Sequence, residues 1–199
     1  MRRVVVLALL AFALPIAAWA DTIDITNKFG EISVSMGGIV STHSEMRSYN
    51  GINAPRSSSL GYVSFGTGAF SGSSLASNGT FSATGSWFDI VSGSGKHAVS
   101  IFSGAFVGPI TWTSTTLPGS HRLTFVLTGD IRGMLNNGHE ETGKTTQYFY
   151  STKFQLSKGI AHISGGTTTL SATPEPGTLG LLGTGLVGIA GIFRRKKSA

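Results

Sequence analysis

The chain has 199 residues, a formal net charge of +6 and no cysteine. The charge is concentrated at the ends: without two N-terminal arginines and four C-terminal cations, nine Lys and Arg balance nine Asp and Glu. A nucleic-acid-binding domain needs cations clustered on one face of its fold, so this distribution argues against nucleic acid as a partner. The lack of cysteine excludes disulfides, thiolate metal sites and cysteine nucleophiles.

The first twenty residues have the layout of a secretory signal peptide. Two arginines precede an apolar stretch over residues 4–14, and Pro15 ends that stretch. Ala18 and Ala20 then flank Trp19 in the small-x-small form that a signal peptidase accepts. We expect cleavage after Ala20 and export of the chain that follows. A retained membrane anchor is the alternative, which the short apolar stretch disfavours.

A second apolar segment lies near the C-terminus. Residues 177–193 carry no charge over 17 positions, and a helix of that length reaches about 25 Å, the lower limit for crossing a bilayer. Four consecutive cations follow and are expected to stay on the cytoplasmic side by the positive-inside rule: Arg194, Arg195, Lys196 and Lys197. We therefore expect a transmembrane helix over 177–193 that places residues 21–176 outside the cytoplasm.

The tripeptide Pro174-Glu175-Pro176 stands immediately before this span. The tripeptide, the glycine-rich apolar span and the terminal Arg/Lys cluster resemble, in that order over residues 173–197, the PEP-CTERM sorting signal of Gram-negative bacteria. The same element also ends some proteins called ice-binding. The resemblance implies that a membrane-embedded exosortase reads the tripeptide, with the cluster of residues 194–197 as a further sorting determinant. It also implies transient membrane attachment, followed by release to the cell surface or extracellular matrix.

Between the two signals, apolar residues alternate with period two. Leu123, Phe125 and Leu127 are an example, and such alternation is typical of strands with one face on a core. Turn signals rich in Gly, Asn and Pro separate roughly ten short strand-like runs, and no stretch of eleven residues shows a convincing helical period. The pattern predicts an all-β domain over residues 21–172, an antiparallel β-sandwich or jelly roll. A repeat β-helix is the alternative architecture.

This domain is poor in groups that do chemistry. Asp89 and Asp130 end or interrupt predicted strands, but no motif pairs them as the two carboxyls of a glycoside hydrolase. The adjacent residues 139–141 (His, Glu, Glu) point to alternate faces of a strand, which is the wrong spacing for a metal site. We expect an exposed hairpin turn there, with Asn137 and Gly138 at its tip. The sequence thus predicts no catalytic residue, no metal and no cofactor.

Aromatic side chains are the candidates for binding. Trp87, Trp112 and Tyr148 are candidate sugar-binding residues, because aromatic rings pack on the apolar faces of sugar rings. The alternative is that such rings fill the core, although the adjacent Trp87 and Phe88 must face opposite sides of a strand. Threonines are frequent in residues 111–116 and 167–169, but these two patches show no repeat, and threonine is also a good strand former.

These patterns favour a non-enzymatic, exported surface or extracellular-matrix protein that contacts exopolysaccharide. Its expected partners are an exosortase-type sorting enzyme, the membrane through residues 177–193, and polysaccharide. The alternative is a secreted carbohydrate-active enzyme that uses Asp89 or Asp130. An ice-binding protein is the third hypothesis, which would require a flat, regular array of threonines.

The sorting hypothesis predicts the result of one substitution. The two prolines fix the backbone around Glu175 and so present its carboxylate at a defined position. Glu175→Ala should therefore leave the full-length chain in the membrane, whereas the wild type is released. Fractionation with an antibody to the exported domain measures this, alongside a variant lacking residues 194–197. Equal release of the wild type and Glu175→Ala would favour a simple membrane anchor.

Overall fold

The computed structural model describes residues 22–172. The residues with period-two alternation form strands throughout this part of the chain. The predicted signal peptide, transmembrane helix and sorting residues lie outside the described residues. The described strands are β1 (Thr22–Lys28), β2 (Glu31–Ser35), β3 (Gly38–Tyr49), β4 (Ile52–Asn53), β5 (Gly61–Gly66), β6 (Phe70–Ser71), β7 (Gly79–Phe81), β8 (Trp87–Ser92), β9 (Val99–Ser114), β10 (Arg122–Leu135), β11 (Glu140–Thr152) and β12 (Ile160–Ala172). Two short helical elements accompany them, η2 (Gly95–His97) and α2 (Lys153–Ser157).

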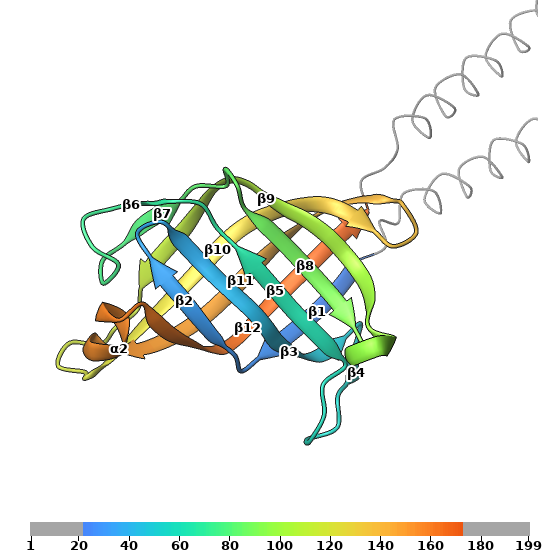
Figure 1. The fold of residues 1–199 in the computed structure, drawn as a ribbon, viewed down its shortest axis with the longest axis horizontal. Coiled ribbons are helices and arrows are strands. Elements are labelled where there is room, and N and C mark those ends of the chain that lie inside the picture. Colours follow the sequence, from blue (N-terminus) through green and yellow to red (C-terminus); the bar gives the residue numbers. More distant parts are fainter. Residues whose placement is uncertain (1–21, 173–199) are drawn as a thin grey trace, which may run out of the picture. The chain divides into compact units, whose positions relative to one another are not determined.

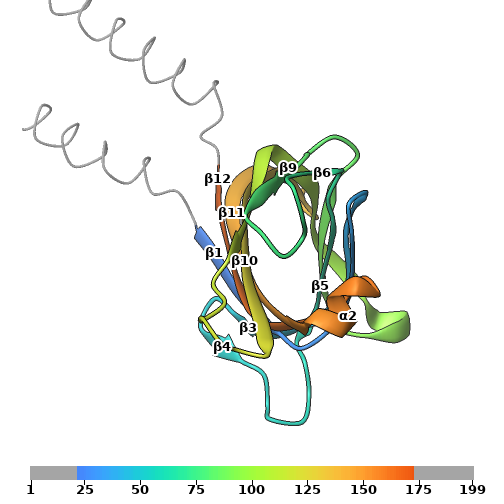
Figure 2. The same ribbon diagram turned by 90° about the vertical axis from the view of Figure 1, so that its left-hand side faces the viewer.

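Eight of these strands close into an antiparallel barrel (Figure 1; Figure 2). The hydrogen-bonded order is β1-β3-β5-β8-β9-β10-β11-β12, and the circle is completed because β12 also pairs with β1. Successive long strands are therefore neighbours, with the first and last strands joined at a seam. The short strands β2, β4, β6 and β7 add further pairings to this wall.

The prediction of an all-β, antiparallel domain is confirmed, but the prediction of a two-sheet sandwich is wrong. Both architectures have one buried and one solvated face per strand, so the sequence alternation is the same for each. The difference lies in β9, which pairs with β8 on one side and with β10 on the other. Because every strand of the ring has two partners, the sheet has no gap at which it divides into two layers.

Two local features depart from a simple strand pattern. The residues before and after Gly108 belong to the single strand β9, although Gly108 has a φ of 72°. Residues 153–157 form the short helix α2 between β11 and β12. Thr152 and Gln155 make reciprocal hydrogen bonds there as a capping box, which ends β11 and starts the helical turn.

Aromatic and aliphatic side chains together fill the inside of the barrel. Trp112 is fully buried, stacks on Phe125 with 4.6 Å between ring centroids, and donates a hydrogen bond from its indole nitrogen to the Leu75 carbonyl. Phe65 packs near Phe149 with 6.4 Å between ring centroids. Within residues 22–172, no helix has the length and apolarity that a membrane crossing requires.

A buried pair of amides lies beside this apolar filling, on the β11–β12–β1 side. Asn27 donates to the Gln147 oxygen at 2.8 Å, and Gln147 donates back to the Asn27 oxygen at 3.1 Å. Both residues are opposite Gly166 in the sheet, one on each neighbouring strand. A Cβ on Gly166 would collide with both side-chain oxygens, lying 2.5 Å from that of Asn27. The amide pair therefore requires glycine at this position of β12.

This arrangement predicts a large difference between two adjacent glycines. Gly166→Ala should lower the free energy of unfolding by about 1–3 kcal/mol, because the buried amides would be displaced from each other. Gly165→Ala is the matched control, since the nearest atom to an added Cβ is 3.8 Å away, and its effect should stay within about 0.5 kcal/mol. Urea unfolding followed by circular dichroism measures both. Equal stability of the two variants would contradict the assigned role of Gly166.

Candidate functional site

Seven outward-facing hydroxyl side chains line up across the wall of the barrel. Direct strand pairing joins each one to the next, from β7 through β9, β10, β11, β12 and β1 to β3. We call this set the hydroxyl row; its members are Thr80, Thr111, Thr128, Thr146, Thr167, Thr26 and Ser48. At about 4.8 Å per strand it extends for about 29 Å along the wall. The Thr26 and Ser48 hydroxyls are hydrogen-bonded at 2.6 Å.

An aromatic surface adjoins the hydroxyl row on β11. Tyr148 and Tyr150 follow Thr146 at alternate positions of this strand and so share its outer face. Tyr148 is 46% exposed, and the residue opposite it on β12 is Gly165, which has no side chain. One flank of Tyr148 therefore has no side chain directly across the strand pair. Tyr150 is paired with His162 on β12, and their ring centroids are 5.3 Å apart.

Arg122 extends this surface onto β10. Its guanidinium lies over the Tyr150 ring, 3.7 Å from the ring centroid, in a cation–π contact. The side chain is exposed, and within residues 22–172 no hydrogen bond or ion pair engages its guanidinium. We call Arg122, Tyr148, Tyr150 and His162 the tyrosine patch. It combines an exposed ring, a stacked cation and the neighbouring hydroxyls on one face of the wall.

The three aromatic residues singled out from the sequence do not come together. Trp112 lies in the core and cannot contact a ligand outside the barrel, so this part of the expectation is wrong. Trp87 lies on the outer face of β8, half-buried against the opposite Gly66, while Phe88 points inward and is fully buried. Tyr148 alone of the three lies in the tyrosine patch. Arg122 was missed because nothing near it in the sequence indicates that it stacks on an aromatic ring one strand away.

The two candidate catalytic carboxylates face outward on different strands. Asp89 on β8 is paired with Ser103 and accepts a hydrogen bond from its hydroxyl at 2.7 Å. Asp130 on β10 is paired with Val107, on the other side of β9. Four residues along the strand and two strand spacings separate the carboxylates, roughly 15 Å. Glycoside hydrolases hold their carboxyl pair about 5–9.5 Å apart.

The polar segment after β10 forms a tight hairpin turn, as expected. Gly138 has a φ of 82°, and its N–H donates to the Leu135 carbonyl at 2.9 Å. Glu140 lies on the outer face and forms an ion pair with Arg132 on β10, while Glu141 points inward and is buried. Among the described residues, no three His, Cys, Asp or Glu side chains gather as a metal site would require.

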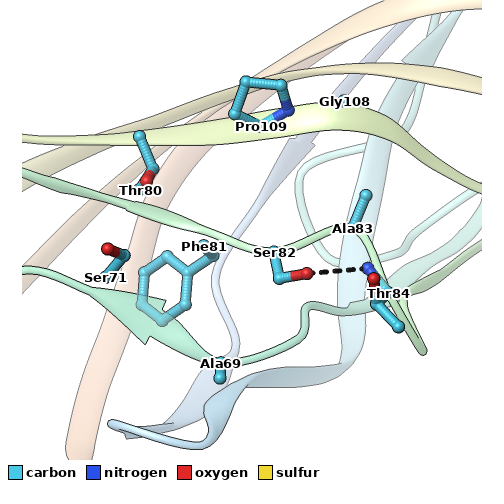
Figure 3. A pocket seen from close by; sticks show the side chains of 9 residues that line it. All are labelled: Ala69, Ser71, Thr80, Phe81, Ser82, Ala83, Thr84, Gly108 and Pro109. Carbon is cyan, nitrogen blue, oxygen red and sulfur yellow. Dashed lines mark hydrogen bonds between the residues drawn. The ribbon is translucent and has the colours of Figure 1, made fainter.

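A hollow of about 460 Å³ lies beside β6, β7 and the Gly108 region of β9 (Figure 3). Small and hydroxyl side chains line it, including Ala69, Ser71 and Thr84, with Phe81 at its base. The Ser82 hydroxyl accepts a hydrogen bond from the Thr84 N–H at 3.0 Å. No charged or titratable side chain contributes to this lining, so the hollow offers packing and hydroxyl contacts rather than acid–base chemistry.

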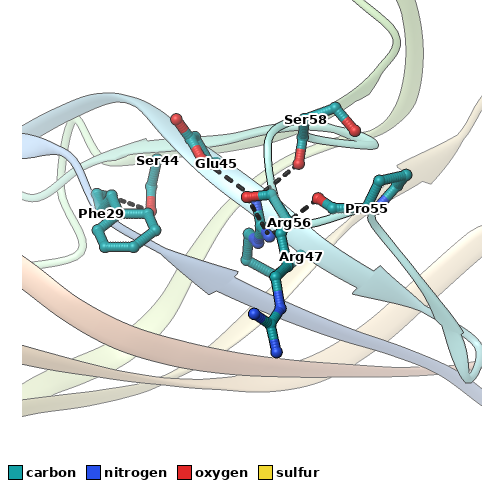
Figure 4. A network of polar contacts seen from close by, with 7 residues as sticks. All are labelled: Phe29, Ser44, Glu45, Arg47, Pro55, Arg56 and Ser58. Atoms are coloured by element: carbon teal, nitrogen blue, oxygen red, sulfur yellow. Dashed lines mark hydrogen bonds and ion pairs between the residues drawn. The ribbon is translucent and has the colours of Figure 1, made fainter.

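Arg47 shows how an arginine is used structurally in this barrel (Figure 4). Its guanidinium donates to the carbonyls of Ser58 at 2.6 Å and Pro55 at 3.1 Å, and it lies 3.5 Å from the Glu45 carboxylate. These bonds hold the connection between β4 and β5. The donors of Arg47 are therefore committed to the fold, in contrast to those of Arg122.

Comparison with known proteins identifies the C-terminal segment. Residues 172–197 match the family model of the PEP-CTERM protein-sorting motif, so the resemblance found in the sequence is confirmed. The chain therefore carries a sorting signal that implies export, processing by an exosortase-type system, and a surface or extracellular location. No curated protein and no solved structure matches the chain.

The ion pair after the hairpin predicts an unusual titration. The hydrogen bond from Arg132 holds the pKa of Glu140 below its usual range. Because the folded-state pKa is lowered, the pair stabilises the fold above the unfolded pKa of Glu, and this contribution is lost as pH falls through the folded value. Carboxyl NMR should show Glu140 titrating below the usual range of a glutamate, and Arg132→Gln should move its titration back toward that range. Arg56→Gln, the control, should leave the Glu140 titration unchanged.

Proposed function

We propose that this chain is a non-enzymatic, exported surface or matrix protein that contacts polysaccharide through the outer wall of its barrel. The sorting motif supports the surface location. The observation that carries the binding proposal is the tyrosine patch beside the hydroxyl row, because a half-exposed ring next to several hydroxyls suits a sugar polymer. The ring offers a flat apolar surface to a sugar face, and the hydroxyls exchange hydrogen bonds with sugar hydroxyls.

The enzymatic alternative has less support. Its two carboxylates, Asp89 and Asp130, are on opposite sides of β9 at a separation too large for either the retaining or the inverting arrangement. Asp89 is in addition engaged by the Ser103 hydroxyl. A panel of polysaccharides should therefore yield no new reducing ends when incubated with the protein.

Ice binding is supported only by the hydroxyl row. The row has the regular spacing of paired strands, which the sequence alone did not reveal. It follows the curved wall of a closed barrel, however, so its seven hydroxyls cannot all meet one flat crystal plane. A flexible polymer can follow such a wall, and the curvature therefore favours polysaccharide over ice.

The proposal predicts that one aromatic substitution weakens polysaccharide binding. In affinity electrophoresis through gels containing single polysaccharides, the full-length protein in mild detergent should be retarded by at least one polymer. Tyr148→Ala should lose several-fold in affinity, because stacking against an aromatic ring contributes about 0.5–1.5 kcal/mol. Phe29→Ala is the matched control, since Phe29 is 52% exposed and lies outside the patch. Retardation by no polymer, or release of reducing ends, would contradict the proposal.

A further inference from the structure

We propose that the tyrosine patch binds the acidic sugar units of a carboxylated polysaccharide, with Arg122 receiving the carboxylate and Tyr148 the neighbouring ring face. This inference rests on the proposed polysaccharide contact and specifies its ligand. The guanidinium carbon of Arg122 lies over the Tyr150 ring, 3.7 Å from its centroid, while the N–H donors of the guanidinium have no partner within residues 22–172.

The guanidinium groups of two other arginines in the barrel do have hydrogen-bond partners within the fold. Arg47 donates to backbone carbonyls of the β4–β5 connection, and Arg132 donates to the Glu140 carboxylate. Arg122 has neither a carbonyl nor a carboxylate. A guanidinium held over an aromatic ring has lost part of its conformational freedom, so less entropy is lost when it forms two parallel hydrogen bonds to a carboxylate.

The strand segments around Arg122 carry no competing acid. Residues 111–114 of β9, 122–128 of β10 and 146–152 of β11 contain no Asp or Glu. On the β12 side, His162 adjoins Tyr150, and the nearest paired carboxylate is Glu31, which is opposite His162 on β2. The charge of Arg122 is thus unopposed within these segments of β9, β10 and β11, which favours an anionic ligand.

The spacing of the patch fits a polymer rather than a single acid. Tyr148 and Tyr150 are two residues apart on β11, about 7 Å along the strand, and Arg122 covers the Tyr150 ring. A carboxylate bound at Arg122 therefore leaves the exposed ring of Tyr148 for the next part of the same chain. The hydroxyl of Thr146 lies at the following outward position of β11, where the polymer continues onto the hydroxyl row.

The test compares two forms of one polymer: polygalacturonate, and the same chain with its carboxyls methyl-esterified. Affinity electrophoresis of the full-length protein in mild detergent should show at least about tenfold tighter binding to the acidic form, as expected for charge-assisted hydrogen bonds. Arg122→Gln should lower the affinity for the acidic form toward that for the ester. Arg122→Lys should recover only part of it, because an ammonium keeps the charge but lacks the planar fork.

Arg56→Gln is the matched charge control. Arg56 is exposed in the β4–β5 connection, outside the patch, so its variant removes one positive charge and should retain the preference for the acidic form. All variants keep the basic residues 194–197, whose contribution to acidic polymers therefore cancels. Circular dichroism confirms that each variant is folded.

The outcomes separate this inference from the proposed function. If both forms bind equally and both depend on Tyr148, polysaccharide contact stands and the acidic specificity is overturned. If Arg122→Gln and Arg56→Gln weaken acidic binding equally, the preference arises from overall charge and the site at Arg122 is again overturned. If a broader panel of polymers also fails to bind, the proposed polysaccharide contact fails together with the inference.

Discussion

The barrel depends on the pairing of its first and last strands, and a buried amide pair locks that seam from inside. β12 lies between β1 and β11, and Asn27 and Gln147 join across it over Gly166. These two hydrogen bonds connect β1 directly to β11 across β12, whereas backbone pairing joins β1 and β11 only through β12. Without the seam, β1 and β12 would both present unpaired edges to solvent or to other chains. The outer surface of the closed wall follows from this closure, because the hydroxyl row crosses the seam between Thr167 and Thr26.

Residues on the inner and outer faces of the barrel wall have different roles. Aromatic side chains on the inner positions fill the barrel and fix its shape, so Trp112, the largest of them, is committed to stability. The outer positions are free of that role and hold the threonines, Tyr148 and Arg122. Sugar contact on such a wall needs no cavity, because a polymer can lie along a convex surface and still touch several strands.

Sequence reasoning predicted the strand class and the hairpin at Gly138, because both depend on local patterns of two to six residues. It could not predict closure, which depends on whether β12 pairs with β1 at the other end of the domain. The hydroxyl row was hidden for the same reason. Its members come one from each of seven strands and align only perpendicular to the strands. Tryptophans were preferred as sugar contacts on residue type alone, which does not tell an inner position from an outer one.

The seam also sets when the fold can be completed. Thr22 on β1 pairs with Ser171 on β12, so the strand that is synthesised first completes its pairing only after the strand that is synthesised last. A chain synthesised from its N-terminus therefore holds an open sheet until Ala172 has appeared, and Ala172 is also the first residue of the sorting motif. Closure requires the most distant contact in the domain, the kind that forms slowly. The strand that closes the barrel thus ends where the sorting motif begins, and its pairing with β1 is the last that the domain can make during synthesis.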